Sequence, residues 1–229
     1  MRFGVVVFPG SNCDMDMVYV LESILEKKVV KLWHKDTDLQ ECDFIILPGG
    51  FSFGDYLRSG AIAKFSPIMK EIIGFANAGG FVMGICNGFQ ILCETELLPG
   101  ALLHNTNHKF ICKNVHLKTI SEDSILTNMI GEKTIKIPIA HGEGRYFTDK
   151  KGIEDLENND QILFKYCNKK GEVTTNSNPN GSIKNIAGVC NKDRNVFGMM
   201  PHPERASDIE LKSLNGRKLF ESILSKVIA

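Results

Sequence analysis

The segment GFVMGICNGFQILC, residues 80–93, decides the fold class of this chain. Residues 80–85 form a short apolar run, as expected of a strand that is buried on both faces of a parallel sheet. Helical character begins at Gly88, so a strand turns into a helix within a few residues. A strand followed at once by a helix is the repeating unit of open α/β sheets.

The same alternation of strand and helix extends on the N-terminal side of this segment. Apolar, β-branched runs predict strands, and apolar residues at helical spacing predict helices. The predicted strands are 3–8, 28–33 and 42–47, and the predicted helices are 14–27 and 62–78. We therefore expect an α/β fold with an open, mostly parallel sheet and helices on both faces.

The C-terminal side of the segment has a different pattern. Strand-like pieces occur at 110–118 and 134–139, a polar stretch at 158–180 predicts a hairpin with loops, strand character returns at 181–189 and 195–200, and an amphipathic helix closes the chain over 215–227. No linker or internal repeat separates these elements. We therefore predict a single domain over residues 1–229 that carries a β-rich insertion.

The composition excludes several classes of protein. The 27 basic residues balance the 27 acidic ones, so a general binder of nucleic acids or of anionic membranes is not expected. No apolar run approaches the ~20 residues that cross a bilayer, and the N-terminal run is too short for a signal peptide. The seven cysteines contain no Cys-x-x-Cys pair, and the six histidines have no zinc-ligand spacing. We expect a cytoplasmic protein without disulfides or a metal site.

One cysteine has the surroundings of a nucleophile. Gly84-Ile85-Cys86-Asn87-Gly88 stands at the predicted junction of strand and helix and has the form of a nucleophile elbow. The helix N-terminus beneath such a thiol favours the thiolate and can bind a developing oxyanion. A cysteine buried in a glycine-containing loop has the same local sequence, so this motif alone leaves both interpretations open.

A base and its partner occur near the C-terminus. His202 and Glu204 are separated by one residue, and Pro203 favours extended backbone at His202, so the two side chains point to one side. Together with Cys86 they would form a Cys-His-Glu triad. A surface turn with a chance His-x-Glu is the alternative.

A glycine-rich loop is a candidate for the oxyanion donors. Pro48-Gly49-Gly50 follows a predicted buried strand and can aim backbone N–H groups into a cleft at the carboxyl ends of the sheet. A flexible turn is the alternative interpretation.

These motifs carry a resemblance to a known family. GICNGFQ (84–90) together with PHPE (201–204) resembles the class I, triad-type glutamine amidotransferases, whose fold is flavodoxin-like. More narrowly, the chain resembles the glutaminase subunits of phosphoribosylformylglycinamidine synthase, on the segments 8–14, 49–58, 138–145 and 198–206. The resemblance extends from residue 3 to the last helix.

The resemblance implies how the triad would act. Cys86 would attack the carboxamide of L-glutamine and give a thioester and ammonia. His202 would serve as the general base and acid, and Glu204 would orient it. Because the chain would act on glutamine, an enzyme is expected.

The resemblance also implies a binding site and partners. The backbone N–H groups of Gly50 and Asn87 would form the oxyanion hole, and Gln90 would help to hold the glutamine. The ammonia would pass to a separate synthetase subunit, with a small accessory subunit bridging the two. The chain has no Walker-type loop, so no cofactor is expected in it, and ATP and Mg²⁺ would serve the synthetase.

Several residues receive no role from the resemblance. His104 and His108 stand where relatives usually carry an arginine and a leucine, in a segment that is either a tolerant surface loop or a pH-sensitive contact. His141 and Glu143 either line the glutaminase cleft or the subunit interface, or form a structural turn in which Glu143 is a cap. The stretch 167–180 looks like a loop insertion.

Two functions compete with that of a glutaminase subunit. One is another elbow-cysteine hydrolase, such as a peptidase or a γ-glutamyl hydrolase. A peptidase would place its histidine soon after Cys86, whereas His202 follows more than a hundred residues later. The other is an inactive homologue that only binds, which the intact set of triad residues disfavours.

Overall fold

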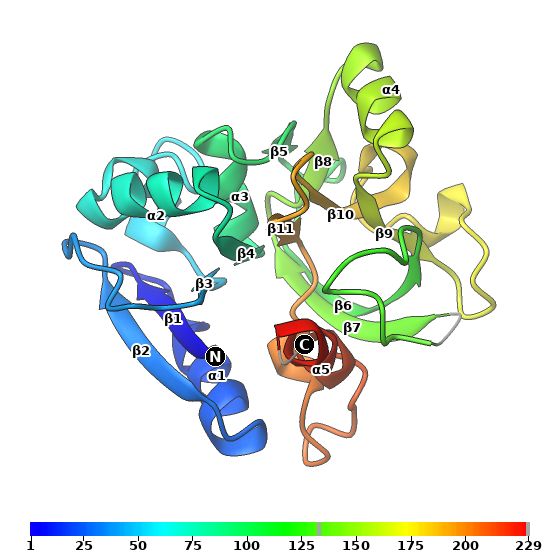
Figure 1. Ribbon diagram of the computed structural model, residues 1–229. Helices are drawn as coiled ribbons and strands as arrows, with labels where there is room; N and C mark the ends of the chain where they lie inside the picture. The colour runs from blue at the N-terminus through cyan, green and yellow to red at the C-terminus, as the bar shows by residue number, and fades with distance from the viewer. Residues whose placement is uncertain (132–133, 228–229) are drawn as a thin grey trace. The chain divides into compact units, whose positions relative to one another are not determined.

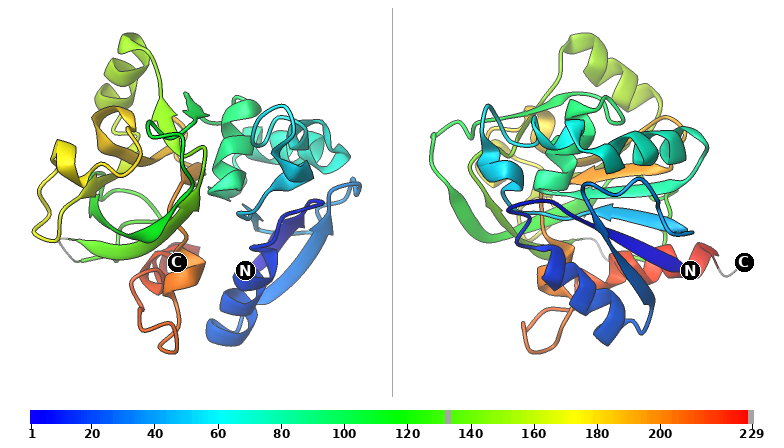
Figure 2. Two further views of the ribbon diagram at one scale, coloured as in Figure 1. Left: turned by 180° about the vertical axis from the view of Figure 1, so that it is seen from behind. Right: turned by 90° about the vertical axis from the view of Figure 1, so that its left-hand side faces the viewer.

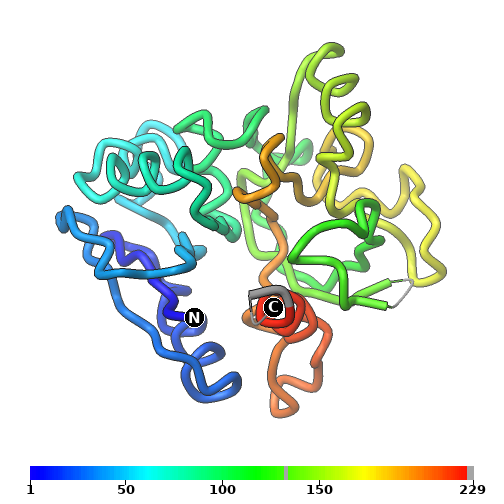
Figure 3. Tube along the Cα trace, in the orientation of Figure 1, coloured from blue at the N-terminus to red at the C-terminus, as the bar shows by residue number. Residues whose placement is uncertain are grey.

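The computed structural model describes residues 1–131 and 134–227 of the chain, and these residues form two compact units (Figure 1). Unit 1 comprises residues 1–99 and 193–198, and unit 2 comprises residues 100–192 and the residues from Met199 on. The chain thus leaves unit 1 after Pro99, returns at Asp193 and leaves again after Gly198 (Figure 3). The division into two units describes the contacts within each unit and does not test whether they form one domain. The single domain over residues 1–229 therefore stays a prediction.

Unit 1 is built on a parallel sheet. Its strands are β1 (Arg2–Val7), β2 (Lys28–Trp33), β3 (Phe44–Leu47), β4 (Phe81–Ile85) and the first three residues of β11 (Val196–Met199), in the order β2-β1-β3-β4-β11. β1 pairs in parallel with β2 and with β3, and β3 pairs in parallel with β4. The order of the first four strands is that of flavodoxin-like sheets.

Helices cover both faces of this sheet. α1 (Asp14–Tyr19) lies on one side, and α2 (Pro67–Asn77) and α3 (Asn87–Glu94) lie on the other (Figure 2). Within the sheet, Phe81 stacks on Phe44 and on Phe197, with ring centroids 6.1 and 6.5 Å apart. The parallel sheet and the helices on both faces confirm the predicted α/β fold.

The strand β11 completes unit 1 from a distant part of the chain. Just before it, the side-chain amide of Asn195 donates hydrogen bonds to the carbonyl oxygens of Ala76 and Gly80, at 2.7 and 2.8 Å. The carbonyl of Asn195 accepts from the N–H of Val82 on β4 at 2.9 Å. Residues 193–198 are therefore anchored to the segment that leads into β4.

Two predicted helices of unit 1 differ from the observed ones. The helix predicted over 14–27 changes to a π-helix at Val20–Ile24, so its hydrogen-bond spacing widens. The helix predicted over 62–78 begins only at Pro67, after a separate short turn. Proline restricts the preceding Ser66 to extended backbone, with ψ at 139°, and this separates the two pieces.

Unit 2 is the β-rich part of the chain, as predicted. Its antiparallel sheet has the order β10-β9-β6-β7, made of β10 (Ile186–Cys190), β9 (Ile162–Cys167), β6 (Ile111–Thr119) and β7 (Ile135–His141). A smaller sheet pairs β5 (Ala101–Leu103) with β8 (Arg145–Phe147). Two helices belong to the unit, α4 (Lys150–Asn158) and α5 (Arg217–Val227).

The hairpin predicted over 158–180 has the wrong bounds, because the antiparallel partner of β9 is β10, which begins at Ile186. The stretch contains one strand, β9, and then a loop that continues to β10. Asn168 closes the first turn of this loop, because its side-chain oxygen accepts from the N–H groups of Lys170 and Glu172 at 2.9 and 3.0 Å. A polar side chain that satisfies the backbone in this way favours a turn over a second strand.

No helix in the described residues combines the length and the apolar character that a membrane span requires.

Candidate active site

Cys86 stands at a sharp turn between β4 and α3. Its φ and ψ are 50° and −106°, which is a conformation that residues other than glycine rarely adopt. The side chain is 4% exposed. Backbone strain at a strand-to-helix junction is the mark of a nucleophile elbow. An ordinary buried cysteine has no need of such a conformation, so the geometry favours the functional interpretation.

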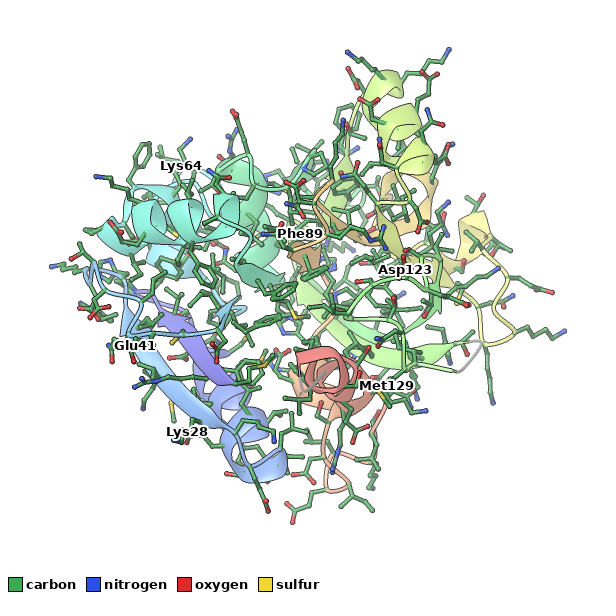
Figure 4. All side chains as sticks on the ribbon, viewed as in Figure 1. Lys28, Glu41, Lys64, Phe89, Asp123 and Met129 are labelled. Carbon is green, nitrogen blue, oxygen red and sulfur yellow. The ribbon has the colours of Figure 1, made fainter. Side chains whose placement is uncertain are left out.

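Glycines on either side make this turn possible. A Cβ atom on Gly88 would lie 1.9 Å from the carbonyl oxygen of Leu47 on β3, and one on Gly84 would lie 2.6 Å from the backbone of Gly88. The start of α3 therefore packs directly on the backbone of the neighbouring strand. Phe89, labelled in Figure 4, is fully buried at this point and leaves no room for a side chain at Gly198.

The loop of Gly50 is bound to the loop that follows β1. Gly50 has a φ of 138°, and a Cβ atom there would lie 2.6 Å from the backbone nitrogen of Asn12. The N–H of Phe51 donates to the carbonyl of Gly10 at 2.9 Å. The conformation of the predicted donor loop therefore depends on a neighbouring loop and on the absence of a side chain.

The side chain of Asn87 joins the elbow to the loop of Gly50. Its oxygen accepts from the N–H of Ser52 at 3.0 Å, and its nitrogen donates to the side-chain oxygens of Gln90 and Asp55 at 2.8 and 3.3 Å. Asn87 and Gln90 are both buried. The sequence predicted only a backbone role for Asn87, because its two loop partners are 35 and 32 residues away in the chain.

His202 and Glu204 form a buried pair in unit 2. Nδ1 of His202 lies 2.6 Å from Oε1 of Glu204, and the two side chains are 1% and 0% exposed. The backbone of His202 is extended, as Pro203 requires, and its N–H donates to the carbonyl of Pro138 on β7 at 2.9 Å. A carboxylate on Nδ1 fixes the orientation of the ring.

A second buried histidine of unit 2 was left without a role by the sequence. Nδ1 of His141 lies 3.1 Å from the side-chain oxygen of Asn105, and burial lowers the pKa of His141 to about 4, with a further contribution from the charge of His202. Asn105 also donates to the carbonyl of His141 at 2.9 Å. His141 is therefore a fixed histidine that is uncharged near neutral pH and within electrostatic reach of His202.

The other polar residues of this region lie at the surface. Nε2 of His104 is 3.5 Å from a carboxylate oxygen of Glu143, and the side chain of His104 is 66% exposed. His108 is exposed beside it, with ring centroids 6.0 Å apart. Their position agrees with a surface loop.

Three of the other cysteines lie where burial disfavours the thiolate. Burial raises the pKa of Cys93, and burial likewise raises the pKa of Cys167 to about 11. Burial also raises the pKa of Cys42. Because a protonated thiol is a weak nucleophile, these three cysteines suit a structural role.

The structure thus forms two sets of candidate residues. The Gly50 loop, Asn87 and Gln90 come together at the elbow of Cys86 in unit 1, and His202 pairs with Glu204 in unit 2. The joining of the two sets into one triad is part of the function proposed below.

Comparisons with known proteins identify the family. Residues 1–224 match the model of the CobB/CobQ-like glutamine amidotransferase domain. The chain is 52% identical over 225 residues to the phosphoribosylformylglycinamidine synthase subunit PurQ of Koribacter versatilis, with 98% of this chain and 97% of that one covered. It is 55% identical over 221 residues to the subunit of the same name from Synechocystis sp., with 96% and 99% covered.

A solved structure agrees with these relatives. The fold is similar to that of a chain in the structure of PurLQS from Thermotoga maritima, with 44% identity, a TM-score of 0.85, and 99% of this chain and 98% of that chain covered. Family model, relatives and fold agree with one another. The chain belongs to the family of CobB/CobQ-like glutamine amidotransferases.

Proposed function

We propose that this chain is the glutaminase subunit of a phosphoribosylformylglycinamidine synthase. It hydrolyses L-glutamine to glutamate and ammonia. A separate synthetase subunit uses the ammonia to make formylglycinamidine ribonucleotide in de novo purine biosynthesis. The observation that carries the proposal is the strained elbow of Cys86, in a chain whose relatives carry the name of this subunit over nearly their full length.

The proposed reaction begins at the thiol of Cys86. His202 takes the thiol proton at Nε2, and the sulfur attacks the carboxamide carbon of glutamine. The N–H groups of Gly50 and Asn87 stabilise the oxyanion that forms. His202 returns the proton to the leaving nitrogen, ammonia departs, and a thioester remains on Cys86.

The second half of the proposed reaction releases glutamate. His202 removes a proton from water, and the resulting hydroxide attacks the thioester. The bond between carbon and sulfur breaks, glutamate leaves, and His202 returns the proton to the sulfur of Cys86. Glu204 holds the Nδ1 proton of His202 and stabilises the imidazolium in both halves. Gln90 binds the glutamine beside the elbow, where the amide of Asn87 holds its side chain at 2.8 Å.

The proposal also assigns the rest of the machinery. ATP and Mg²⁺ serve the synthetase subunit, and this chain binds no cofactor. A small accessory subunit joins the two, no nucleic acid or membrane takes part, and the complex works in the cytoplasm.

The substitution Cys86→Ala in the assembled complex tests this function. Glutamine-dependent synthesis of the amidine should fall to near zero, because no other group can form the thioester. Ammonium supplied at alkaline pH should restore synthesis, since the synthetase needs only free ammonia. Product formation from each nitrogen source is the measurement.

Two results would contradict the proposal. If glutamine still supports synthesis by the Cys86→Ala variant, Cys86 is not the nucleophile. If the chain has another substrate, as an unrelated hydrolase would, a glutamine-like electrophile should leave Cys86 unlabelled. The matched control is Cys112→Ala, which removes the exposed cysteine and should leave both activities unchanged.

A further inference from the structure

A trough with a volume of about 790 Å³ opens on the surface of unit 2. Its walls come from the strands β6 and β7, from the turn after His202, and from the loop that leads to α5, drawn in orange beside α5 in Figure 1. The lining residues are Asn114, Lys136, Arg205, Ile209 and 211–215. We call this surface the basic trough.

The basic trough concentrates positive charge in a chain whose net charge is zero. Lys136 and Lys212 are exposed on it, and Arg205 is half-buried. Among the described residues, none that lines it is an aspartate or a glutamate. Asp208, in the same loop, is 8% exposed, and its carboxylate accepts from the N–H of Glu210 at 3.0 Å. The surface therefore complements a negatively charged partner.

Apolar side chains stand beside these cations. Ile209, Leu211 and Leu214 are 75%, 54% and 42% exposed. Large apolar side chains that form a contiguous exposed patch mark an interaction surface. The trough therefore offers both charge and apolar area to whatever binds it.

This mixture favours a peptide segment over a free anion. A site for free phosphate needs donors that converge, such as backbone N–H groups at a helix N-terminus or a guanidinium fork. The two lysines are exposed and come from different elements. None of the buried polar atoms that lack a hydrogen-bond partner in the described chain lines the trough. An acidic segment with apolar residues matches the surface better.

Two residues that line the trough lie close to backbone groups that hydrogen-bond to the backbone of His202. Lys136 lies on β7 two residues before Pro138, whose carbonyl accepts from the N–H of His202 at 2.9 Å. The N–H of Arg205 donates to the carbonyl of His202 at 3.2 Å. An occupant that contacts Lys136 and Arg205 therefore braces the backbone on both sides of His202.

The loop of the trough is itself tied to these supports. The N–H of Lys136 donates to the side-chain oxygen of Asn215 at 2.6 Å. The N–H of Gly216 donates to the carbonyl of Ala206, at the end of the turn that carries Glu204, at 2.7 Å. A partner that binds this loop is therefore linked through hydrogen bonds to β7 and to the turn that carries Glu204.

We propose that the basic trough is the docking surface for an acidic segment of the synthetase subunit. This inference rests on the proposed function, in which the synthetase receives the ammonia and must lie beside the site. Docking braces the turn that carries Glu204, so glutamine is hydrolysed at the full rate only when the receiver of the ammonia is in place.

The double variant Lys136→Glu/Lys212→Glu, in the full chain, tests the docking site. Its Kd for the intact synthetase subunit, measured by titration calorimetry, should rise at least about tenfold at low ionic strength, and the difference should shrink as salt screens the charges. The control Lys151→Glu/Lys170→Glu changes the net charge equally at two exposed lysines elsewhere in unit 2. Its Kd should stay within about twofold of the parent value.

Two further measurements distinguish a loss of docking from misfolding of the variants. The milder variant Lys136→Gln/Lys212→Gln should weaken binding by an intermediate amount, because it removes charge without adding repulsion. Labelling of Cys86 by a glutamine-like electrophile in the isolated chain should be the same in all variants. Equal labelling shows that the elbow is intact while docking is lost.

The outcomes separate the docking site from the function. A Kd that is the same for the trough and control variants overturns the docking site, and the function stands if Cys86→Ala still abolishes glutamine-dependent synthesis. Inorganic phosphate is the second probe. If phosphate binds the parent chain but not the Gln variant, while the Kd for the synthetase is unchanged, the trough binds a free anion and the docking site is overturned.

Discussion

Units 1 and 2 hold their candidate site residues by opposite means. Unit 1 relies on backbone conformation, with Cys86 at a φ of 50° and Gly88 packed where no side chain fits. Unit 2 relies on buried hydrogen bonds between side chains, with Glu204 on His202 and Asn105 on His141. A site set by backbone packing fails when a residue grows by one carbon atom, whereas a site set by buried polar pairs fails when a charge or a proton changes.

The largest effect is expected from Gly88→Ala in unit 1. The new Cβ atom would lie 1.9 Å from the carbonyl oxygen of Leu47, so the helix and the strand must separate. The free energy of unfolding should fall by more than about 4 kcal/mol, as measured by urea denaturation. The control is Gly74→Ala, where nothing lies within 4 Å of the new atom and the better helix propensity of alanine should stabilise the chain by about 0.5–1 kcal/mol. Equal midpoints for the two variants would contradict the role of the backbone.

The next effect is expected from Glu204→Gln in unit 2. The substitution keeps the size of the side chain but removes the charge that stabilises the imidazolium of His202. Glutaminase turnover should fall on the order of a thousandfold, or about 4 kcal/mol, with unchanged circular dichroism. His202→Ala should lose more, because Glu204 acts only through His202. The exposed Glu154→Gln on α4 is the control, and a variant at Glu204 that turns over like this control would remove Glu204 from the triad.

A pH effect of about 3 kcal/mol is expected from His141. Burial lowers its pKa from 6.5 to about 4, so the unfolded chain binds a proton at a higher pH than the native chain does. The stability contributed by neutral His141 is therefore complete above pH 6.5 and is lost as the pH falls towards 4. His141→Gln should flatten the dependence of the unfolding free energy on pH across this range. The exposed His108→Gln should leave that dependence unchanged, and a parent curve that is already flat would contradict the prediction.

The smallest effect is expected from Asn87→Ala in unit 1, which removes the side chain that accepts a hydrogen bond from Ser52. The Asn87 backbone N–H stays, but the N–H of Ser52 loses its acceptor and the Gly50 loop loses a tie to the elbow. Turnover should fall about tenfold, or about 1.4 kcal/mol. KM should rise as well, because the side chain of Gln90 loses the amide that holds it. Asn77→Ala, at the exposed end of α2, is the control. A change confined to KM would show that Asn87 serves glutamine binding and not the donor loop.

The core strands of unit 1 were predictable because burial on both faces leaves an unbroken apolar run. The strands β5 and β8 have only three residues each, which is too short for an apolar run to be recognised. The helix α4 buries only Ile153 and Leu156, so its sequence shows no clear helical periodicity of apolar residues. The helix α4 did carry one signal that was missed. Asp149 accepts from the N–H of Gly152 at 2.7 Å, which is an ordinary N-cap.

The candidate site divides in the same way. Cys86, His202 and Glu204 lie in short motifs, where each residue is interpreted from its immediate neighbours. The role of the Asn105 side chain depends on His141, 36 residues further on, and that of Asn87 depends on Ser52, 35 residues before it. An asparagine in a single sequence carries no sign of such a partner, because the fold alone brings the two together.

The late arrival of residues 193–198 in unit 1 has a consequence for synthesis on the ribosome. At about 5–20 residues per second, roughly 5–20 s pass between the emergence of residue 99 and that of β11. Throughout this interval the growing polypeptide has an uncovered strand edge at β4, and Phe89 lacks its neighbour Gly198. A strand edge of this kind is a template for pairing with another chain, so the nascent chain is prone to aggregation during this interval. The packing around the elbow of Cys86 is therefore complete only when almost all of the polypeptide has been made.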